Sequence, residues 1–337
     1  MMRAPAASID CTESPVDASL MLARRFGQGA RLAIEGRTCP DHAHHVAVEF
    51  VHPVVAGARA LPAVVVTDVS AAVDDCRLVI GHDDDADLTI SDSLDDADIM
   101  RSYHVLWELV QVCLEHPGIV GVAAPDGGDS TGFLYPFLDA AEIDEGSLRS
   151  SLASSAVTKR EESSRVMTDA LERNRTQIDA AGAAIAEAAA SGGRVFTVGN
   201  GGSSTDAARL VRLLRTLGVD ATSLASDYAV LSALANDLGA DRVFARQLEA
   251  FAQPGDVLIA CSTSGASVNL LQALERADSH GLIGIGITGY GGGAFVHHPG
   301  VTHCLTVDST SVHRIQEAQA AIIGALCRSV ERLGKPT

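Results

Sequence analysis

Basic side chains are scarce in this chain of 337 residues, which carries 25 Lys and Arg against 43 Asp and Glu and has a formal net charge of −18. Non-specific binding to nucleic acid depends on a basic surface, so this balance argues against a nucleic-acid partner. It leaves room for a small anionic ligand, because a few convergent backbone N–H groups can hold a phosphate locally.

Other absences narrow the class further. The seven cysteines are an odd number and form no C-x-x-C pair, which argues against a disulfide framework and a zinc ribbon. The first residues, MMRAPAASIDCTESP, lack the apolar segment of a signal peptide. No uninterrupted apolar run reaches the length of about 18 residues that crossing a membrane requires. We therefore expect a cytoplasmic protein with reduced thiols and no membrane partner.

Aromatic residues make up only 4% of the chain, whereas 47% is apolar and 31 residues are glycine, a composition that suits closely packed α/β layers. In the second half, amphipathic stretches at 160–191 and 312–333 enclose short β-rich runs. These runs lie at 194–199, 220–225, 256–261, 283–288 and 302–307. Their alternation with helical stretches predicts an α/β fold: a parallel sheet with helices on both faces, a flavodoxin-like three-layer sandwich. Ligands of such sheets bind at the carboxyl edge.

The first half resembles a shortened copy of the second. ARLAIEG at 30–36 resembles GRVFTVG at 193–199, and ADLTISDS at 86–93 resembles THCLTVDS at 302–309. The spacing between matching segments grows along the chain, so the first copy has lost part of its middle. We expect two domains, a truncated one over 15–150 and a complete one over 155–335. The boundary is expected in the polar, Ser-rich stretch 145–160.

The truncation predicts a defect in the first sheet. Only HDDDA separates the predicted strands 77–81 and 87–91. A parallel crossover usually needs a dozen or more residues. At least one helical crossover should therefore be missing, and the sheet should be incomplete.

Two loops in the second half carry the features of a phosphate site. GNGGSS at 199–204 and STSGAS at 262–267 each follow a predicted strand and lead into a helix. Glycine lets the backbone approach an anion, the helix N-terminus presents N–H groups, and serine hydroxyls add donors. No Lys-Ser/Thr follows the glycines, and no dinucleotide fingerprint or ribose-binding acid is evident. A phosphate monoester is therefore the predicted ligand, and a nucleotide-cofactor oxidoreductase has little support.

The motifs GNGGSS, LANDLGADRVFARQLEAFAQPGDVLIACSTSGAS, ITGYGGG and HRIQEA resemble the sugar isomerase (SIS) domain family over about 160–335. Within it they are most similar to phosphoheptose isomerases, which interconvert sedoheptulose 7-phosphate and a heptose 7-phosphate. The resemblance implies that five hydroxyl side chains hold the sugar phosphate: Ser203, Ser262, Thr263, Ser264 and Ser267. It also implies a sugar-binding set made of Asn200, Gly201, Asn236, Asp237 and Gln316.

The second half departs from the family at its catalytic positions. The family's isomerases carry His-x-x-x-Glu on the helix after the first loop, and a Gln and a His eight residues apart on the last helix; together these bind zinc. Here Arg209 and Leu213 replace the first pair, Gln316 is kept, and Gly324 replaces the last His. Leucine and glycine can neither bind a metal nor transfer a proton, so this domain alone should bind without catalysing.

The first half shows the converse pattern. Its stretch HVAVEFVHP…ALPAVVV…YHVLWELV resembles the same family over about 20–118, and it keeps His45, Glu49 and His104 at the catalytic positions. Asp96 occupies the Gln position. The resemblance implies that His45, Glu49 and His104 bind zinc and that Glu49 and His104 move protons. Two interpretations stay open, a working site and a relic of one.

Two neighbouring features receive a simpler interpretation. His42 and His44 are interpreted as surface neighbours of the histidine–glutamate pair rather than as ligands. The acidic stretch Asp83–Asp98 lacks the glycine and the closing glutamate of a calcium loop, so a solvated loop is predicted there.

These patterns lead to a hypothesis of divided labour. The second domain would hold the phosphate, and the first would supply the proton-moving side chains of an aldose–ketose isomerase acting on sedoheptulose 7-phosphate. Because the family forms tetramers, a homodimer of this tandem chain would present four SIS units. The alternative is a non-catalytic sugar-phosphate sensor or scaffold of the same family.

Overall fold

The computed structural model describes residues 8–54, 57–67, 75–83, 85–121 and 144–334. The chain divides into two compact units, unit 1 over Met1–Glu162 and unit 2 over Ser163–Thr337. The polar stretch 145–160, where we expected the boundary, lies inside α5 (Glu145–Ala190), a continuous helix of 46 residues. No helix in the described part of the chain is both long and apolar enough to cross a membrane.

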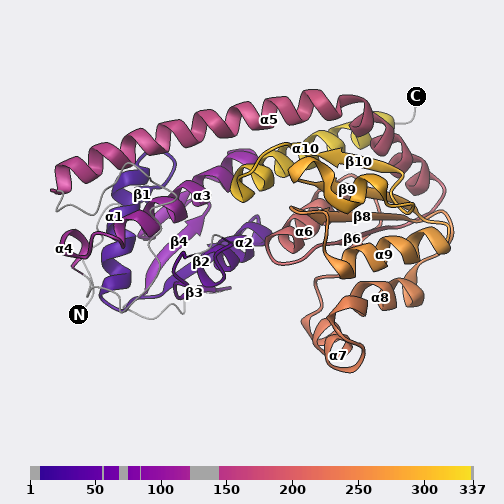
Figure 1. The fold of residues 1–337 in the computed structure, drawn as a ribbon, viewed down its shortest axis with the longest axis horizontal. Coiled ribbons are helices and arrows are strands. Elements are labelled where there is room, and N and C mark those ends of the chain that lie inside the picture. Colours follow the sequence, from indigo (N-terminus) through magenta and orange to yellow (C-terminus); the bar gives the residue numbers. More distant parts are fainter. Residues whose placement is uncertain (1–7, 55–56, 68–74, 84, 122–143, 335–337) are drawn as a thin grey trace. The chain divides into compact units, whose positions relative to one another are not determined.

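Unit 2 contains the predicted parallel sheet (Figure 1). Its strand order is β10-β9-β8-β6-β7, and every neighbouring pair is parallel. The strands fall on the five predicted runs: β6 (Val195–Val198), β7 (Ala221–Ser223), β8 (Val257–Ser262), β9 (Ile283–Thr288) and β10 (His303–Thr306). The fold class predicted from the sequence is confirmed.

Helices cover both faces of this sheet. They are α6 (Gly202–Thr216), α7 (Tyr228–Leu238), α8 (Val243–Phe251), α9 (Val268–Ser279) and α10 (Val312–Gly334), with 3₁₀ turns η1 (Ala240–Arg242) and η2 (Tyr290–His297). Successive side chains of β8 point to opposite faces of the sheet, and both faces are buried. Ile259 packs with α5, α6 and α10 on one face, whereas Leu258 and Ala260 pack with α8 and α9 on the other. The result is a three-layer sandwich.

Unit 1 also contains five parallel strands, in the order β1-β5-β4-β2-β3. Its elements are β1 (Ile9–Asp10), α1 (Pro15–Gly27), β2 (Leu32–Gly36), α2 (Pro40–Val51), β3 (Ala63–Val65), β4 (Cys76–Ile80), β5 (Leu88–Ile90), α3 (Asp96–Cys113) and α4 (Pro117–Val120). Almost every residue of α3 is buried, including Trp107, so this helix forms the centre of the unit.

The prediction of an incomplete first sheet is wrong in strand number and right about the crossover. Strands β4 and β5 pair in parallel, with Leu78 opposite Leu88, and no helix is found in the described residues between them. Because β5 has three residues, the chain must return only about 10 Å, which a short loop can span. The two-residue β1 then pairs with β5 at Ile9 and supplies a fifth strand.

Candidate functional site

The first serine loop of unit 2 makes a tight turn onto the N-terminus of α6. Gly201 has φ 52° and ψ −126°, a backbone conformation that favours glycine. A Cβ atom on Gly199 would lie 2.2 Å from the carbonyl oxygen of Ser203, so only glycine fits there. Ser203 is buried at the first turn of α6, and the Ser204 hydroxyl donates to the Gly201 carbonyl at 2.7 Å. The glycines thus bring the backbone close to the helix end.

The second serine loop follows β8 and leads into α9. The Ser262 hydroxyl, which is 4% exposed, accepts a hydrogen bond from the Gly265 N–H at 3.0 Å. The Ser264 hydroxyl is exposed and accepts from the Ala266 N–H at 3.3 Å, and Ser267 stands at the N-cap of α9. Each hydroxyl that accepts a backbone bond keeps its own proton for donation to an anion.

The structure brings the two serine loops together. Strands β6 and β8 are parallel neighbours, so their carboxyl ends meet at one edge of the sheet. Asn200 of the first loop and Asn269 of α9 exchange two amide hydrogen bonds, each of 2.9 Å. Sequence reasoning missed Asn269, whose signal was its place in the first turn after the second loop.

Two members of the predicted sugar-binding set lie on α7. Asn236 and Asp237 are exposed at the end of α7, and the Asn236 amide donates to the Asp237 carboxylate at 2.7 Å. In the described part of the chain no hydrogen bond joins either residue to a serine loop. None of the residues of α7 is buried, although Leu231 and Leu234 pack half-buried against the core.

A buried ion pair occupies one of the lost catalytic positions of unit 2. Arg209, at the family's His position, and Asp206 are both 0% exposed, and their charged groups are 3.1 Å apart. On α10, Arg314 and Glu317 form a second buried pair at 2.9 Å, beside the buried Gln316. A guanidinium stays protonated, so Arg209 and Arg314 cannot act as bases. The sequence showed the substitution at 209 but not that the carboxylate of Asp206 pairs with Arg209.

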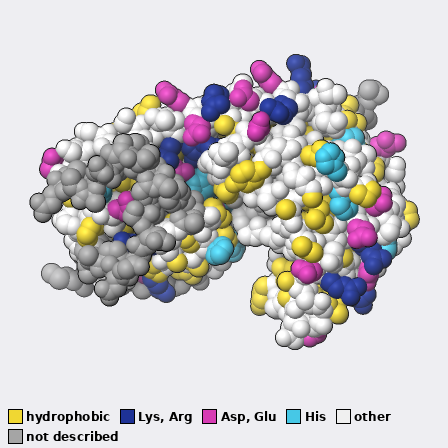
Figure 2. Space-filling view, viewed as in Figure 1, with side chains coloured by type: hydrophobic (Ala, Val, Ile, Leu, Met, Phe, Trp, Pro, Cys, Tyr) yellow, Lys and Arg dark blue, Asp and Glu magenta, His cyan; other side chains and the backbone are white. Residues whose placement is uncertain are grey.

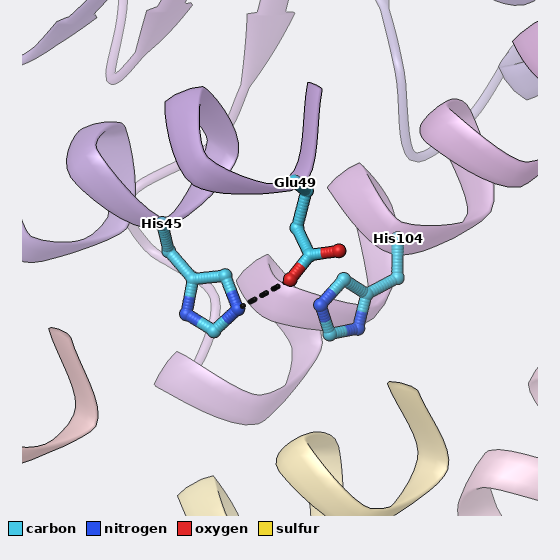
Figure 3. A group of neighbouring side chains, drawn as sticks. All are labelled: His45, Glu49 and His104. Carbon is cyan, nitrogen blue, oxygen red and sulfur yellow. Dashed lines mark ion pairs between the residues drawn. The ribbon is translucent and has the colours of Figure 1, made fainter. Parts of the chain in front are cut away.

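Unit 1 gathers the predicted catalytic set in its interior (Figure 3). Pro40 begins α2, which places His45 and Glu49 one turn apart on one face, and Asp95 caps α3, which carries His104. One ligand atom from each of His45, Glu49 and His104 lies within 4.8 Å of the others. Their exposed fractions are 0%, 1% and 0%. Glu49 Oε1 is 3.4 Å from His45 Nε2.

The donor set fits a zinc ion. Two imidazoles and one carboxylate are the ligands of many catalytic zinc sites, which leave a fourth position open. Burial of Glu49 is compatible with this, because a divalent cation would offset the cost of burying a carboxylate. The geometry therefore permits metal binding by His45, Glu49 and His104.

The interpretation of His42 as a surface neighbour is wrong, although His44 is exposed as expected. His42 is fully buried, with Nε2 at 2.9 Å from Asp96 Oδ1 and Nδ1 at 3.3 Å from the Tyr103 hydroxyl. Asp96, expected with the zinc set, is thus placed beside His42. The spacing of three residues between His42 and His45 could have shown that both share one face of α2.

The prediction of a solvated acidic loop also fails at its first residue. The Asp83 carboxylate is 12% exposed and pairs with Arg37 at 2.7 Å and Arg77 at 3.1 Å. Burial alone would raise the pKa of Asp83, but hydrogen bonds from the Asp85 N–H and from Arg77 together lower it below its ordinary value. This end of the loop is part of an ion-pair network.

The fold and the loops define a protein of two α/β units, one with two serine loops at the edge of its sheet and one with a buried cluster of two histidines and a glutamate. Residues 160–289 match the SIS domain family. A phosphoheptose isomerase of Roseiflexus sp. strain RS-1 is 41% identical over 147 residues, 42% of this chain and 74% of that relative. Another, of Geobacter metallireducens, is 38% identical over 177 residues, 50% of this chain and 93% of that relative. The chain belongs to the SIS domain family and is phosphoheptose isomerase-like.

Solved structures of phosphoheptose isomerases are also similar to this chain. The phosphoheptose isomerase of Neisseria gonorrhoeae matches with a TM-score of 0.52 and 29% identity, over 54% of this chain and 99% of that one. The C-terminal domain of a glucosamine-fructose-6-phosphate aminotransferase of Francisella tularensis matches 96% of this chain and 95% of its own, with a TM-score of 0.54 and 9% identity. That likeness shows the fold alone. This chain is longer than its phosphoheptose isomerase relatives, which match about half of it.

Proposed function

We propose that the protein is a sugar-phosphate isomerase that interconverts sedoheptulose 7-phosphate and an aldoheptose 7-phosphate. The buried cluster of His45, Glu49 and His104 carries the proposal, because these side chains come together from α2 and α3. The corresponding His, Glu and last His of the family are replaced in unit 2. Identity of about 40% to phosphoheptose isomerases supports the reaction and the substrate class.

Unit 2 supplies the phosphate site in this proposal. The hydroxyls of Ser203, Thr263, Ser264 and Ser267, with the backbone at the start of α6 and α9, can donate to a phosphate monoester. Gly201 and the Asn200–Asn269 pair, which joins the first serine loop to α9, are proposed to contact the sugar hydroxyls. Asn236, Asp237 and Gln316 remain proposed sugar-binding residues on α7 and α10.

Unit 1 supplies the proton transfers. The Glu49 carboxylate removes the proton from the carbon beside the carbonyl group, which gives an enediol, and His104 exchanges the proton on the sugar oxygen. His45 orients Glu49 through their contact of 3.4 Å. A zinc ion held by His45, Glu49 and His104 would supply polarisation of the substrate carbonyl.

Conversion of sedoheptulose 7-phosphate by the zinc-loaded full-length chain tests the proposal. We expect Glu49→Gln to lower kcat at least about 100-fold, because the base is lost while the shape is kept. We expect Ser264→Ala to weaken substrate binding about tenfold or more, because one hydrogen bond to a charged group is lost. Turnover that survives Glu49→Gln would contradict the assignment.

Matched controls separate these effects from general damage. His44→Ala changes an exposed histidine on the same helix as Glu49, and Ser279→Ala changes an exposed serine at the far end of α9. Both variants should keep the turnover and the substrate affinity of the unchanged protein.

The second candidate function is a sugar-phosphate sensor or scaffold. The replacements Arg209, Leu213 and Gly324 favour it, because they leave unit 2 with no proton-transfer group at these family positions. Arg209 is instead held in a buried ion pair with Asp206. A sensor would bind sedoheptulose 7-phosphate in the Glu49→Gln variant and the unchanged chain alike, with no turnover in either.

We also propose that the protein forms a homodimer. Helix α7 buries none of its residues, and its Tyr228 and Leu238 are 85% and 43% exposed. Figure 2 shows hydrophobic side chains gathered around this helix. An exposed apolar helix is typical of a subunit interface. Light scattering of the purified chain should give twice the mass of one chain, and a monomer at micromolar concentration would contradict this.

A further inference from the structure

A second group of possible metal ligands lies in unit 1, one turn before the histidine–glutamate pair. It consists of Asp41 and His42 at the start of α2 and Asp96 at the start of α3. One ligand atom from each lies within 4.8 Å of the other two. Asp41 is 6% exposed, His42 is 0% exposed, and the Asp96 side chain is 22% exposed. Two carboxylates therefore share a mostly buried space with one imidazole.

The distances suit a shared ion. Two neighbouring ligand atoms that each lie about 2.1 Å from one metal ion are roughly 3.0 Å apart in an octahedral site and roughly 3.4 Å apart in a tetrahedral one. His42 Nε2 and Asp96 Oδ1 are 2.9 Å apart. The other ring nitrogen of His42, Nδ1, is 3.3 Å from the Tyr103 hydroxyl. Histidines that bind a metal usually donate their second N–H to such an oxygen, which fixes the ring.

The two negative charges of Asp41 and Asp96 also favour a bound cation. Two carboxylates held close together in a medium of low dielectric repel each other, and a divalent cation between them offsets that repulsion. A set of two carboxylates and one imidazole suits Mn²⁺ or Zn²⁺. The partial exposure of Asp96 leaves a way in for the ion and for water ligands.

We propose that Asp41, His42 and Asp96 form a second divalent metal site, distinct from the set of His45, Glu49 and His104. Tyr103 connects the two groups. Its hydroxyl contacts His42, and its ring centre lies 5.4 Å from the ring of His45 and 5.0 Å from the ring of His104. An ion at the second site would hold His42 and so fix the Tyr103 ring against which both histidines pack.

Metal content of the full-length protein tests this proposal. The protein is stripped with a chelator, reloaded with Zn²⁺ or with Mn²⁺, desalted, and analysed by mass spectrometry for metal per chain. We expect two ions in the unchanged protein, one in Asp96→Asn, one in Glu49→Gln, and none in the double variant. Asp41→Asn should lower affinity at the same site as Asp96→Asn, and His44→Ala should keep both ions.

A metal content that Asp96→Asn and Asp41→Asn leave unchanged would overturn the proposal, because Asp96, His42 and Tyr103 would then form a hydrogen-bonded chain without an ion. Circular dichroism of each variant confirms that a lost ion is not a lost fold. The test is independent of the isomerase reaction. Two bound ions without turnover would contradict the proposed function alone, and turnover with one ion that only Glu49→Gln removes would contradict the second site alone.

Discussion

At the residue scale, the two units bury different ionisable side chains on corresponding helices. In unit 1, a helix face places His42, His45 and Glu49 in the interior, where a carboxylate and imidazoles meet. In unit 2, the corresponding helix places Arg209 there, and Asp206 one turn earlier neutralises it. Buried charge is costly unless it is paired, and in unit 2 Asp206 is the partner of Arg209.

Breaking the Arg209–Asp206 pair should therefore destabilise unit 2. Removing one partner leaves an uncompensated buried charge, and we expect Asp206→Ala to lower the free energy of unfolding by about 3–5 kcal/mol. The double variant Asp206→Ala with Arg209→Met should lose less than Asp206→Ala alone. Urea unfolding followed by circular dichroism measures both. Equal stability of Asp206→Ala and the unchanged protein would contradict this account.

At the element scale, the turns between strands and helices decide where ligands can bind. The turn from β6 to α6 needs glycine at 199, because the Ser203 carbonyl oxygen occupies the space of a side chain. The second turn needs Gly265, whose φ is +61° and whose Cβ would lie 2.4 Å from the Gly292 carbonyl oxygen. Both serine loops are thus held by backbone sterics.

Gly199→Ala should displace the first turn of α6. We expect loss of measurable sedoheptulose 7-phosphate binding by calorimetry, because the added methyl group cannot fit without moving the Ser203 backbone. Gly334→Ala is the control, since nothing lies within 4 Å of the added carbon there. Unchanged affinity in Gly199→Ala would show that the first loop does not hold the ligand.

Asp83, in the loop after β4, should make the stability of the fold depend on pH. Because the folded-state pKa of Asp83 is lowered, its ion pairs stabilise the fold above the unfolded-state pKa of about 4, and this contribution is lost as the pH falls through the folded-state value. Asp83→Asn should cost about 1 kcal/mol at pH 7 and almost nothing near pH 2. Thermal unfolding at both pH values checks this, and a pH-independent difference would argue against the ion pairs.

At the scale of the whole molecule, the sequence predicted unit 2 well and unit 1 in part. Glycine and serine residues flank the strands of unit 2 in the sequence, so the strand positions could be predicted. The two-residue β1 carries too few residues for any pattern. The continuity of α5 through the Ser-rich stretch 145–160 was also hidden, because tertiary packing of Leu148 and Leu152 holds a helix that its polar residues do not favour.

The residues of the candidate site were also predictable only in part. Spacing placed His45 and Glu49 on one face, and the resemblance added His104, because side-chain types at fixed intervals are visible in a sequence. The partners contributed by another element were not visible. Asn269 beside Asn200, and Asp96 beside His42, depend on which strands and helices become neighbours.

The central claim is that Glu49 of unit 1 moves a proton on a sugar phosphate. Its most direct measurement is isomerisation of sedoheptulose 7-phosphate in D₂O by the zinc-loaded full-length chain, followed by NMR of the sugar. We predict that deuterium from the solvent enters the product at the carbon beside the carbonyl group, and that Glu49→Gln abolishes both product and label. Incorporation that persists in Glu49→Gln, or no product and no label after long incubation of the unchanged protein, would contradict the account.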